Sequence, residues 1–244
     1  MKNTTTAIIL SGGKGKRMGT SVSKQYLMLN EKPILYYTLE SFNQSNIDNI
    51  IIVASQSDIS YVQSEIVDKY NISKVQAIIE GGAERYNSVY NGLKYIESNL
   101  NVLKKTEYVL IHDGARPFIS VEIINKTIDE VDSYKACIVG MPVKDTIKIV
   151  DADENVSSTP DRNNLWQIQT PQAFQYRLIM DAYEKVISSG ITNITDDSMV
   201  LETVSDKKIH LIKGSYENLK ITTPEDLEVG KTILKKMKKN QKSC

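Results

Sequence analysis

A glycine-rich turn near the N-terminus carries the residues best suited to chemistry. It spans residues 11–18 (SGGKGKRM) and follows the apolar run Ala7–Leu10, which predicts a buried strand. Glycines let backbone N–H groups approach phosphate oxygens, while the cations of the turn and Lys24 supply charge for a polyphosphate. The turn lacks the third glycine of a Rossmann fingerprint, which would stand at Met18, and the Lys-Ser/Thr of a P-loop. We interpret it as a nucleoside-triphosphate loop of another kind; the alternative is an ordinary surface turn.

Two further clusters follow predicted strands. Gly81 and Gly82 precede a predicted helix that contains Ser88, so backbone groups and a hydroxyl could meet a base or a sugar, although a plain helix cap would look the same. Asp113 ends another predicted strand, with Arg116 three residues later. That pair combines an oxygen ligand for Mg²⁺ with an anion clamp, or it is a local ion pair.

The last two clusters lie in the second half of the chain. Lys144–Thr146, with Arg162 beyond them, occupies a polar stretch that has little structural need for such residues. Lys220 stands between apolar neighbours after the last predicted strand, and we interpret it as a phosphate ligand.

Together these residues favour one kind of reaction. Arg17, Lys24 and Lys220 would surround a triphosphate, Asp113 would hold its metal ion, and Arg116 or Arg162 would bind a second anionic substrate. Such a set fits in-line attack of a substrate phosphate on an α-phosphate, catalysed by positioning and charge neutralisation.

The pattern of elements places these clusters at one edge of a sheet. Short apolar runs alternate with helical patterns, which predicts a Rossmann-like α/β fold: a mostly parallel sheet with helices on both faces. Strands are expected over residues 6–10, 49–54, 75–79, 108–112, 137–141 and 208–212, and helices over 34–43, 59–70, 85–98, 121–134, 177–188 and from 224 onward. From Pro142 to Gln169 the sequence becomes polar and alternating, which predicts a hairpin-like excursion from a single domain of residues 1–244.

Composition excludes several classes. With 30 basic and 30 acidic residues the net charge is zero, which argues against bulk binding to nucleic acid or membrane. Cys137 and Cys244 have neither metal-site nor disulfide spacing, and no signal-type or membrane-spanning apolar run is present, so a cytoplasmic location is expected. A dinucleotide-dependent oxidoreductase would need an acidic ribose ligand after the second strand, where Val53, Ala54 and Ser55 stand. A catalytically inactive binding protein would have lost its charged ligands, which are present here.

The chain resembles the 2-C-methyl-D-erythritol 4-phosphate cytidylyltransferase family of non-mevalonate isoprenoid synthesis, which also includes ribitol 5-phosphate cytidylyltransferases. The resemblance covers essentially the whole chain. The matching motifs, in order, lie at residues 12–18, 23–26, 81–85 with Ser88, 112–118, 142–146, 161–166, 169–172, 195–197 and 218–222.

The resemblance implies a Mg²⁺-dependent transferase that joins CTP and 2-C-methyl-D-erythritol 4-phosphate, acting as a homodimer with exchanged arms at about residues 142–169. It assigns phosphate binding to Ser11, Gly12, Gly13 and Gly15, transition-state neutralisation to Arg17, Lys24 and Lys220, and the cytidine pocket to Gly82 and Ser88. It assigns Mg²⁺ to Asp113, and the sugar-phosphate side to Asp113, Arg116, Thr170 and Thr195, with Thr146 and Arg162 supplied by the neighbouring subunit.

The resemblance leaves the acceptor open. Residues 10–13 (LSGG) are nearer to the polyol-phosphate branch, whereas Gly114-Ala115, residues 144–146 and Leu165-Trp166 look like the isoprenoid branch. Methylerythritol phosphate is the expected acceptor; ribitol 5-phosphate, or another polyol phosphate for cell-surface polymer synthesis, is the alternative.

Overall fold

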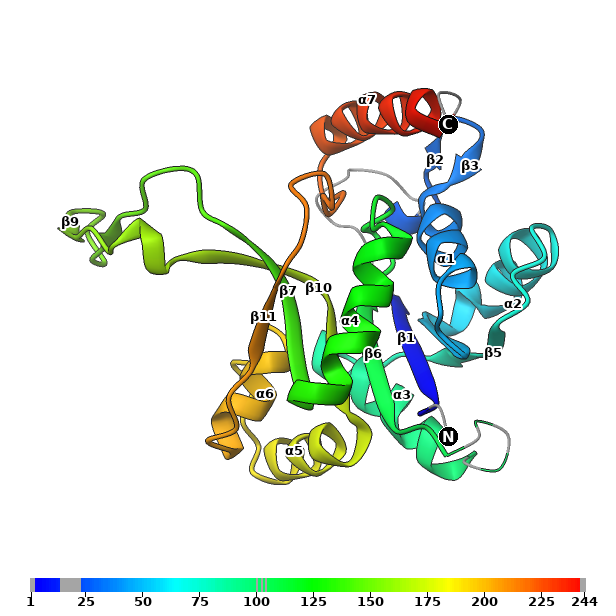
Figure 1. Cartoon of the computed structure of the whole chain (residues 1–244), viewed down its shortest axis with the longest axis horizontal. Coiled ribbons are helices and arrows are strands. Elements are labelled where there is room, and N and C mark those ends of the chain that lie inside the picture. Colours follow the sequence, from blue (N-terminus) through cyan, green and yellow to red (C-terminus); the bar gives the residue numbers. More distant parts are fainter. Residues whose placement is uncertain (1–2, 14–22, 100, 102, 104, 242–244) are drawn as a thin grey trace.

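A central sheet organises the molecule in the computed structural model, which describes residues 3–13, 23–99, 101, 103 and 105–241 (Figure 1). Its seven strands, in spatial order, are β11 (His210–Lys213), β7 (Ala136–Pro142), β10 (Trp166–Gln175), β6 (Tyr108–Asp113), β1 (Thr5–Ser11), β4 (Asn49–Ala54) and β5 (Val75–Glu80). All neighbouring strands are parallel except β10, which runs antiparallel to both β6 and β7.

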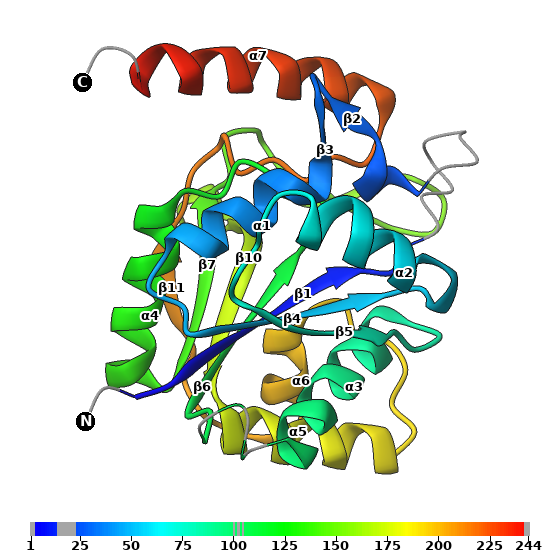
Figure 2. The same ribbon diagram turned by 90° about the vertical axis from the view of Figure 1, so that its right-hand side faces the viewer.

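Helices cover both faces of this sheet (Figure 2). One face carries α1 (Ile34–Gln44), α4 (Val121–Tyr134), and α2 (Ile59–Tyr61), which continues as a π-helical segment over Val62–Asp68. The other carries α3 (Arg85–Ser98), α5 (Tyr176–Ser188) and α6 (Asp197–Val204). The closing helix α7 (Pro224–Gln241) packs near the small hairpin of β2 (Met28–Leu29) and β3 (Lys32–Pro33).

Strand β1 shows why the layers form. Its residues alternate between the two cores: Ala7 and Ile9 pack into one cluster and Ile8 into the other, each with no exposed surface. Parallel strands that are covered on both faces read as continuous apolar runs, which is the pattern that predicted β1 and β4. The predicted mostly parallel sheet with helices on both faces is confirmed.

Strand β10 was missed, and the predicted excursion therefore ended too late. Residues 166–168 do not project from the sheet but pair with β7, in the register Trp166↔Pro142 and Ile168↔Gly140. The sequence hides this strand because Pro171 falls within it, and a proline cannot donate to a ladder. The ladder to β7 shifts register between Ile168 and Gln172, on either side of that proline. Helix α6 was also not predicted.

The projecting segment, here called the arm, comprises residues 143–165. It leaves the sheet between β7 and β10 and ends in a hairpin of β8 (Ile149–Val150) and β9 (Val156–Ser158) (Figure 1). The predicted hairpin-like excursion is thus confirmed over these residues, and its later part, 166–169, belongs to β10.

Among the described residues, no helix is both long and apolar enough to cross a membrane.

Candidate active site

A cleft opens where β1, β4, β5 and β6 end. The chain proceeds from β1 through β4 to β5 on one side and then returns to place β6 on the other side of β1, which is where open α/β sheets bind ligands. The cleft encloses about 720 Å³. Its lining includes residues from four of the five predicted clusters: Ser11, Gly12, Gly13, Lys24, Gly82, Ser88, Asp113 and Lys220.

The described part of the glycine-rich turn is open toward the cleft. A Cβ on Gly13 would meet nothing within 4 Å, and one on Gly12 would meet only ordinary contacts at 3.8 Å or more. Packing against the described residues therefore does not itself demand glycine at these two positions, which fits a requirement imposed by a bound phosphate. Gly15 and Arg17 lie outside the described residues.

Ser11 connects this turn to Lys24. The serine is buried, and its carbonyl accepts a hydrogen bond of 2.6 Å from Nε2 of Gln25. Gln25 belongs to the 3₁₀ turn Lys24–Tyr26, so this bond fixes the segment that places Lys24 at the cleft. Gln25 was not predicted as a site residue, because a glutamine in a short turn carries no distinctive signal.

The Gly82–Ser88 segment closes on itself. The Gly82 amide donates to Oγ of Ser88 at 3.0 Å, and that hydroxyl donates to the Glu84 carbonyl at 3.1 Å. A Cβ on Gly82 would lie 2.4 Å from Cβ of Asn87, so the first turn of α3 requires glycine at this position. The alternative interpretation of this segment, a cap at the start of a helix, is therefore confirmed. The same segment also lines the cleft.

A charge cluster surrounds Asp113 at the end of β6. The Lys220 Nζ lies 2.8 Å from its Oδ2, Arg85 Nε lies 3.5 Å from its Oδ1, and Arg116 Nε lies 3.7 Å from its Oδ2. The side chain of Asp113 is only 11% exposed. Burial alone would raise the pKa of this carboxyl, but the charges of Arg85, Lys220 and Arg116 hold it well below its usual range. The cleft therefore keeps a permanent carboxylate next to several cations.

Arg85 pairs with the fully buried carboxylate of Asp197, a contact that the sequence did not reveal. Two nitrogens of Arg85 donate to the two carboxylate oxygens of Asp197 at 2.9 and 2.7 Å, and Tyr183 donates to Oδ1 at 2.6 Å. Burial opposes the charge of Arg85, but Asp197 and Asp113 together raise its pKa. Arg85 and Asp197 each lie within a motif of the family resemblance, at residues 81–85 and 195–197. They are 112 positions apart, so no local sequence signal indicates that their side chains are in contact.

Arg116 and Thr170 connect the charge cluster around Asp113 to neighbouring residues by hydrogen bonds. Nη1 of Arg116 donates to the Asn218 carbonyl at 2.8 Å, and the Thr170 hydroxyl accepts from the Asp113 amide at 3.1 Å. The same hydroxyl lies 3.0 Å from Nδ1 of His112. Burial lowers the pKa of His112 to about 3, so its ring is neutral at pH 7. The predicted local ion pair between Asp113 and Arg116 is present, and contact of Arg116 or Thr170 with a substrate stays a prediction.

The remaining predicted residues lie away from the cleft lining of their own chain. Thr195 is exposed just before α6, and its hydroxyl donates to the sulfur of Met199 at 3.5 Å. Thr146 and Arg162 are exposed on the arm, where Nη1 of Arg162 donates to the Lys144 carbonyl at 2.9 Å. The structure therefore brings the described residues that were predicted for the nucleotide to one cleft and leaves the arm residues apart from it.

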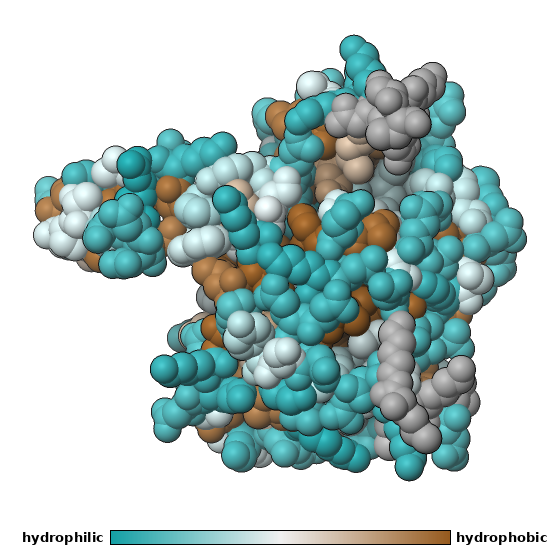
Figure 3. All heavy atoms as spheres, in the orientation of Figure 1, coloured by the Kyte–Doolittle hydropathy of each residue, from teal (hydrophilic) through white to brown (hydrophobic). Residues whose placement is uncertain are grey.

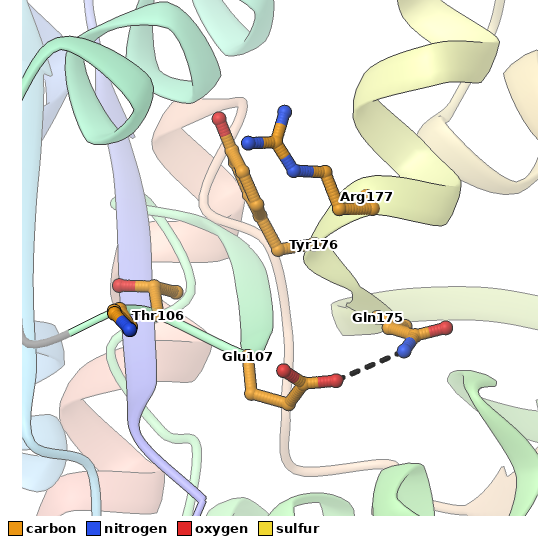
Figure 4. Close-up of a pocket in the computed structure, with 6 residues that line it drawn as sticks. Thr106, Glu107, Gln175, Tyr176 and Arg177 are labelled. Atoms are coloured by element: carbon orange, nitrogen blue, oxygen red, sulfur yellow. Dashed lines mark hydrogen bonds between the residues drawn. The ribbon is translucent and has the colours of Figure 1, made fainter. Parts of the chain in front are cut away.

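A second hollow, of about 310 Å³, lies at the opposite edge of the sheet, before the start of β6 (Figure 4). There Nε2 of Gln175 donates to Glu107 at 2.9 Å, and Arg177 lies beside the Tyr176 ring and pairs with Glu97 at 3.0 Å. These side chains are engaged with one another, and none comes from a predicted cluster.

Comparison with known proteins identifies one family over nearly the whole chain. The family model described as IspD, 2-C-methyl-D-erythritol 4-phosphate cytidylyltransferase, matches residues 5–236. A protein of that name from Lachnoclostridium phytofermentans is 50% identical over 230 residues, which is 94% of this chain and 96% of that protein. Another, from Clostridium botulinum (strain 657), is 48% identical over 95% of this chain and 98% of its own. The crystal structure of a 4-diphosphocytidyl-2C-methyl-D-erythritolsynthase from Anaerococcus prevotii, 36% identical, matches with a TM-score of 0.83 over 96% of this chain and 97% of the other.

Proposed function

The chain belongs to the 2-C-methyl-D-erythritol 4-phosphate cytidylyltransferase family, and from that premise we propose how its residues perform the reaction. The protein is a nucleotidyltransferase that joins CTP and 2-C-methyl-D-erythritol 4-phosphate in isoprenoid precursor synthesis. The ribitol 5-phosphate alternative is not favoured, because the similar proteins described above carry the methylerythritol name. We place the enzyme in the cytoplasm, since its two cysteines fit reducing conditions.

The observation that carries the mechanism is the cluster of cations at the end of β6. A phosphate oxygen of the acceptor attacks the α-phosphorus of CTP, the new P–O bond forms as the bond to the β-phosphate oxygen breaks, and pyrophosphate leaves. The attacking oxygen is already anionic, so no general base is needed. The task of the protein is to neutralise charge, and Lys220 and Lys24, both at the cleft, are placed to do so.

We assign Mg²⁺ to Asp113 as part of this proposal. The described residues contain no group of three or more His, Cys, Asp or Glu side chains arranged for a metal. A magnesium ion does not need one, because it is commonly held by one or two carboxylates together with phosphates and water. Asp113 fits that role because it lines the cleft and its pKa keeps it ionised. The chemistry the ion supplies when bound is neutralisation of phosphate charge.

The arm is proposed to complete the acceptor site of a second subunit. Its surface carries apolar side chains among polar ones (Figure 3), and Ile147, Ile149, Val150 and Val156 are between 40% and 61% exposed. Apolar residues on a projecting hairpin favour burial against another chain. Thr146 and Arg162 lie on this arm and would reach the sugar phosphate of the partner's cleft.

CTP is expected to be preferred strongly over UTP and ATP. Gly81, Gly82 and Ala83 line the cleft with side chains no larger than a methyl group, so this wall presents peptide groups to a base. A wrong base leaves buried polar groups unpaired, at about 1–3 kcal/mol for each. Pyrophosphate release with methylerythritol phosphate and each nucleotide measures the preference, and equal kcat/KM values for CTP and ATP would contradict the assignment.

The variant Asp113→Asn is expected to need more Mg²⁺ for half-maximal activity and to be less stable. It removes an anionic metal ligand, and it leaves Arg85, Arg116 and Lys220 without their shared counterion, which costs about 3–5 kcal/mol for a buried pair. Mg²⁺ titrations of turnover and thermal unfolding would measure both effects. Asp129→Asn, at an exposed site on α4, is the control. A lower stability with an unchanged Mg²⁺ titration would make Asp113 a counterion only.

A further inference from the structure

The loop that presents Lys220 to the cleft is fastened to strand β10. This loop, residues 214–220, follows β11. The Ser215 carbonyl accepts from Nε2 of Gln169 at 2.8 Å, and Nδ2 of Asn218 donates to the Thr170 carbonyl at 2.9 Å. Asn218 is fully buried. The position of Lys220 is therefore tied to β10, the strand that forms the second root of the arm.

Tyr216 reaches from the same loop to the first root of the arm. Its hydroxyl donates to the Pro142 carbonyl at 2.8 Å, and Nζ of Lys144 lies 3.5 Å from the centre of its ring. The Lys144 carbonyl accepts in turn from Nη1 of Arg162, on the returning limb of the arm. One tyrosine thus contacts the point where the arm leaves the sheet and the residue that holds Arg162.

One further backbone hydrogen bond lies at the base of the arm. Beyond the last pair of the sheet, the Val143 amide donates to the Leu165 carbonyl at 3.0 Å, which joins the two limbs to each other but not to the body. Tyr216 is 44% exposed, so it is not a core residue whose packing is needed for folding. Its specific partners, rather than burial, distinguish it from an ordinary surface aromatic.

We propose that Tyr216 is a positioning residue that sets the direction of the arm relative to Lys220. It acts through Pro142 and Lys144, and touches no substrate itself. The inference rests on the proposed function in one respect, which is that the arm delivers Thr146 and Arg162 to an acceptor site.

The kinetic test is the variant Tyr216→Ala. Loss of the hydrogen bond and of the cation–π contact is expected to raise KM for the sugar phosphate by about 5–30-fold while KM for CTP stays unchanged. Tyr216→Phe keeps the ring beside Lys144 and should give an intermediate KM. Tyr134→Ala is the matched control, because Tyr134 is 46% exposed and stacks on His210 without a contact to the arm. Equal KM values for the sugar phosphate in Tyr216→Ala and the wild type would contradict the link between the direction of the arm and the acceptor site.

A distance measurement tests the geometry apart from activity. Spin labels at Asp153→Cys, in the hairpin turn of the arm, and Asp206→Cys, in the body, report the direction of the arm. Both changes are made in a Cys244→Ser background. The remaining Cys137 is not a labelling site, because it is buried and burial raises the pKa of its thiol to about 12. Dilution with unlabelled protein limits the signal to one chain. Tyr216→Ala should broaden the distance distribution and Tyr134→Ala should not.

The two readouts separate the failures. An unchanged distance distribution in Tyr216→Ala overturns the positioning role, whatever the kinetics. A broadened distribution with an unchanged sugar-phosphate KM overturns the link from the arm to the acceptor. Failure of the wild type to release pyrophosphate from CTP and methylerythritol phosphate would instead overturn the proposed function.

Discussion

Replacing Lys220 with alanine is expected to slow cytidylyl transfer by about 10²–10³-fold, the scale for loss of one preorganised electrostatic group. The lysine lies 2.8 Å from Asp113 and lines the cleft in which the proposed mechanism places the reacting phosphates. The loss should fall on kcat, since an interaction strongest in the transition state lowers kcat and kcat/KM together. Steady-state pyrophosphate release with saturating CTP and Mg²⁺ measures it.

The control for this variant is Lys213→Ala, an exposed lysine at the end of β11. It should behave as the wild type, and both variants should retain the fold by circular dichroism. Lys24→Ala is expected to slow the reaction to a similar extent, because Lys24 lines the same cleft. If Lys220→Ala turned over normally, the last motif would be structural and its lysine only a counterion of Asp113.

The parallel part of the fold could be predicted because its signals are local. The strands β1 and β4 are continuous apolar runs, and α3 and α4 begin and end at the predicted residues 85, 98, 121 and 134. Strand β10 could not be predicted, because its stability comes from neighbouring strands that are distant in sequence. It pairs with β6 on one side and β7 on the other, which offsets the weak strand propensity of a segment containing Pro171 and several glutamines.

The candidate site, like the fold, could be predicted where its signals are local and could not be predicted where distant residues meet. Residues that follow a strand, such as Ser11, Gly12 and Asp113, could be placed at the cleft because the carboxyl ends of parallel strands share one edge. Partnerships between those ends could not be predicted. The bond from Arg85 to Asp197 joins the start of α3 to the start of α6, and α6 itself was not expected. Tyr216 likewise becomes informative only when its contact with Lys144 is seen.

Two variants that are each defective at a sugar-phosphate concentration well below the KM of Arg162→Ala are expected to regain activity on mixing if the arm completes a partner's site. Arg162→Ala should raise KM for the sugar phosphate by about 10–100-fold, since a charge-assisted bond to its phosphate is lost. Lys24→Ala should remove transfer in its own cleft. In a heterodimer of the two, one site combines the intact Lys24 of one chain with the intact Arg162 of the other. Equal mixing after dissociation should therefore restore about a quarter of the wild-type sites.

This experiment distinguishes an Arg162 that acts in the partner's cleft from an Arg162 that acts in the cleft of its own chain. If Arg162 reached the cleft of its own chain, each site of the heterodimer would carry one defect and no activity would return. The structure favours sharing, because Arg162 is exposed on the arm and does not line the cleft to which Lys24 and Lys220 belong. Differently tagged chains, purified through both tags, would verify that heterodimers had formed. Verified heterodimers that remain inactive, or an active monomer at assay concentration, would contradict the shared site and leave the exposed Ile149, Val150 and Val156 of the arm without a partner.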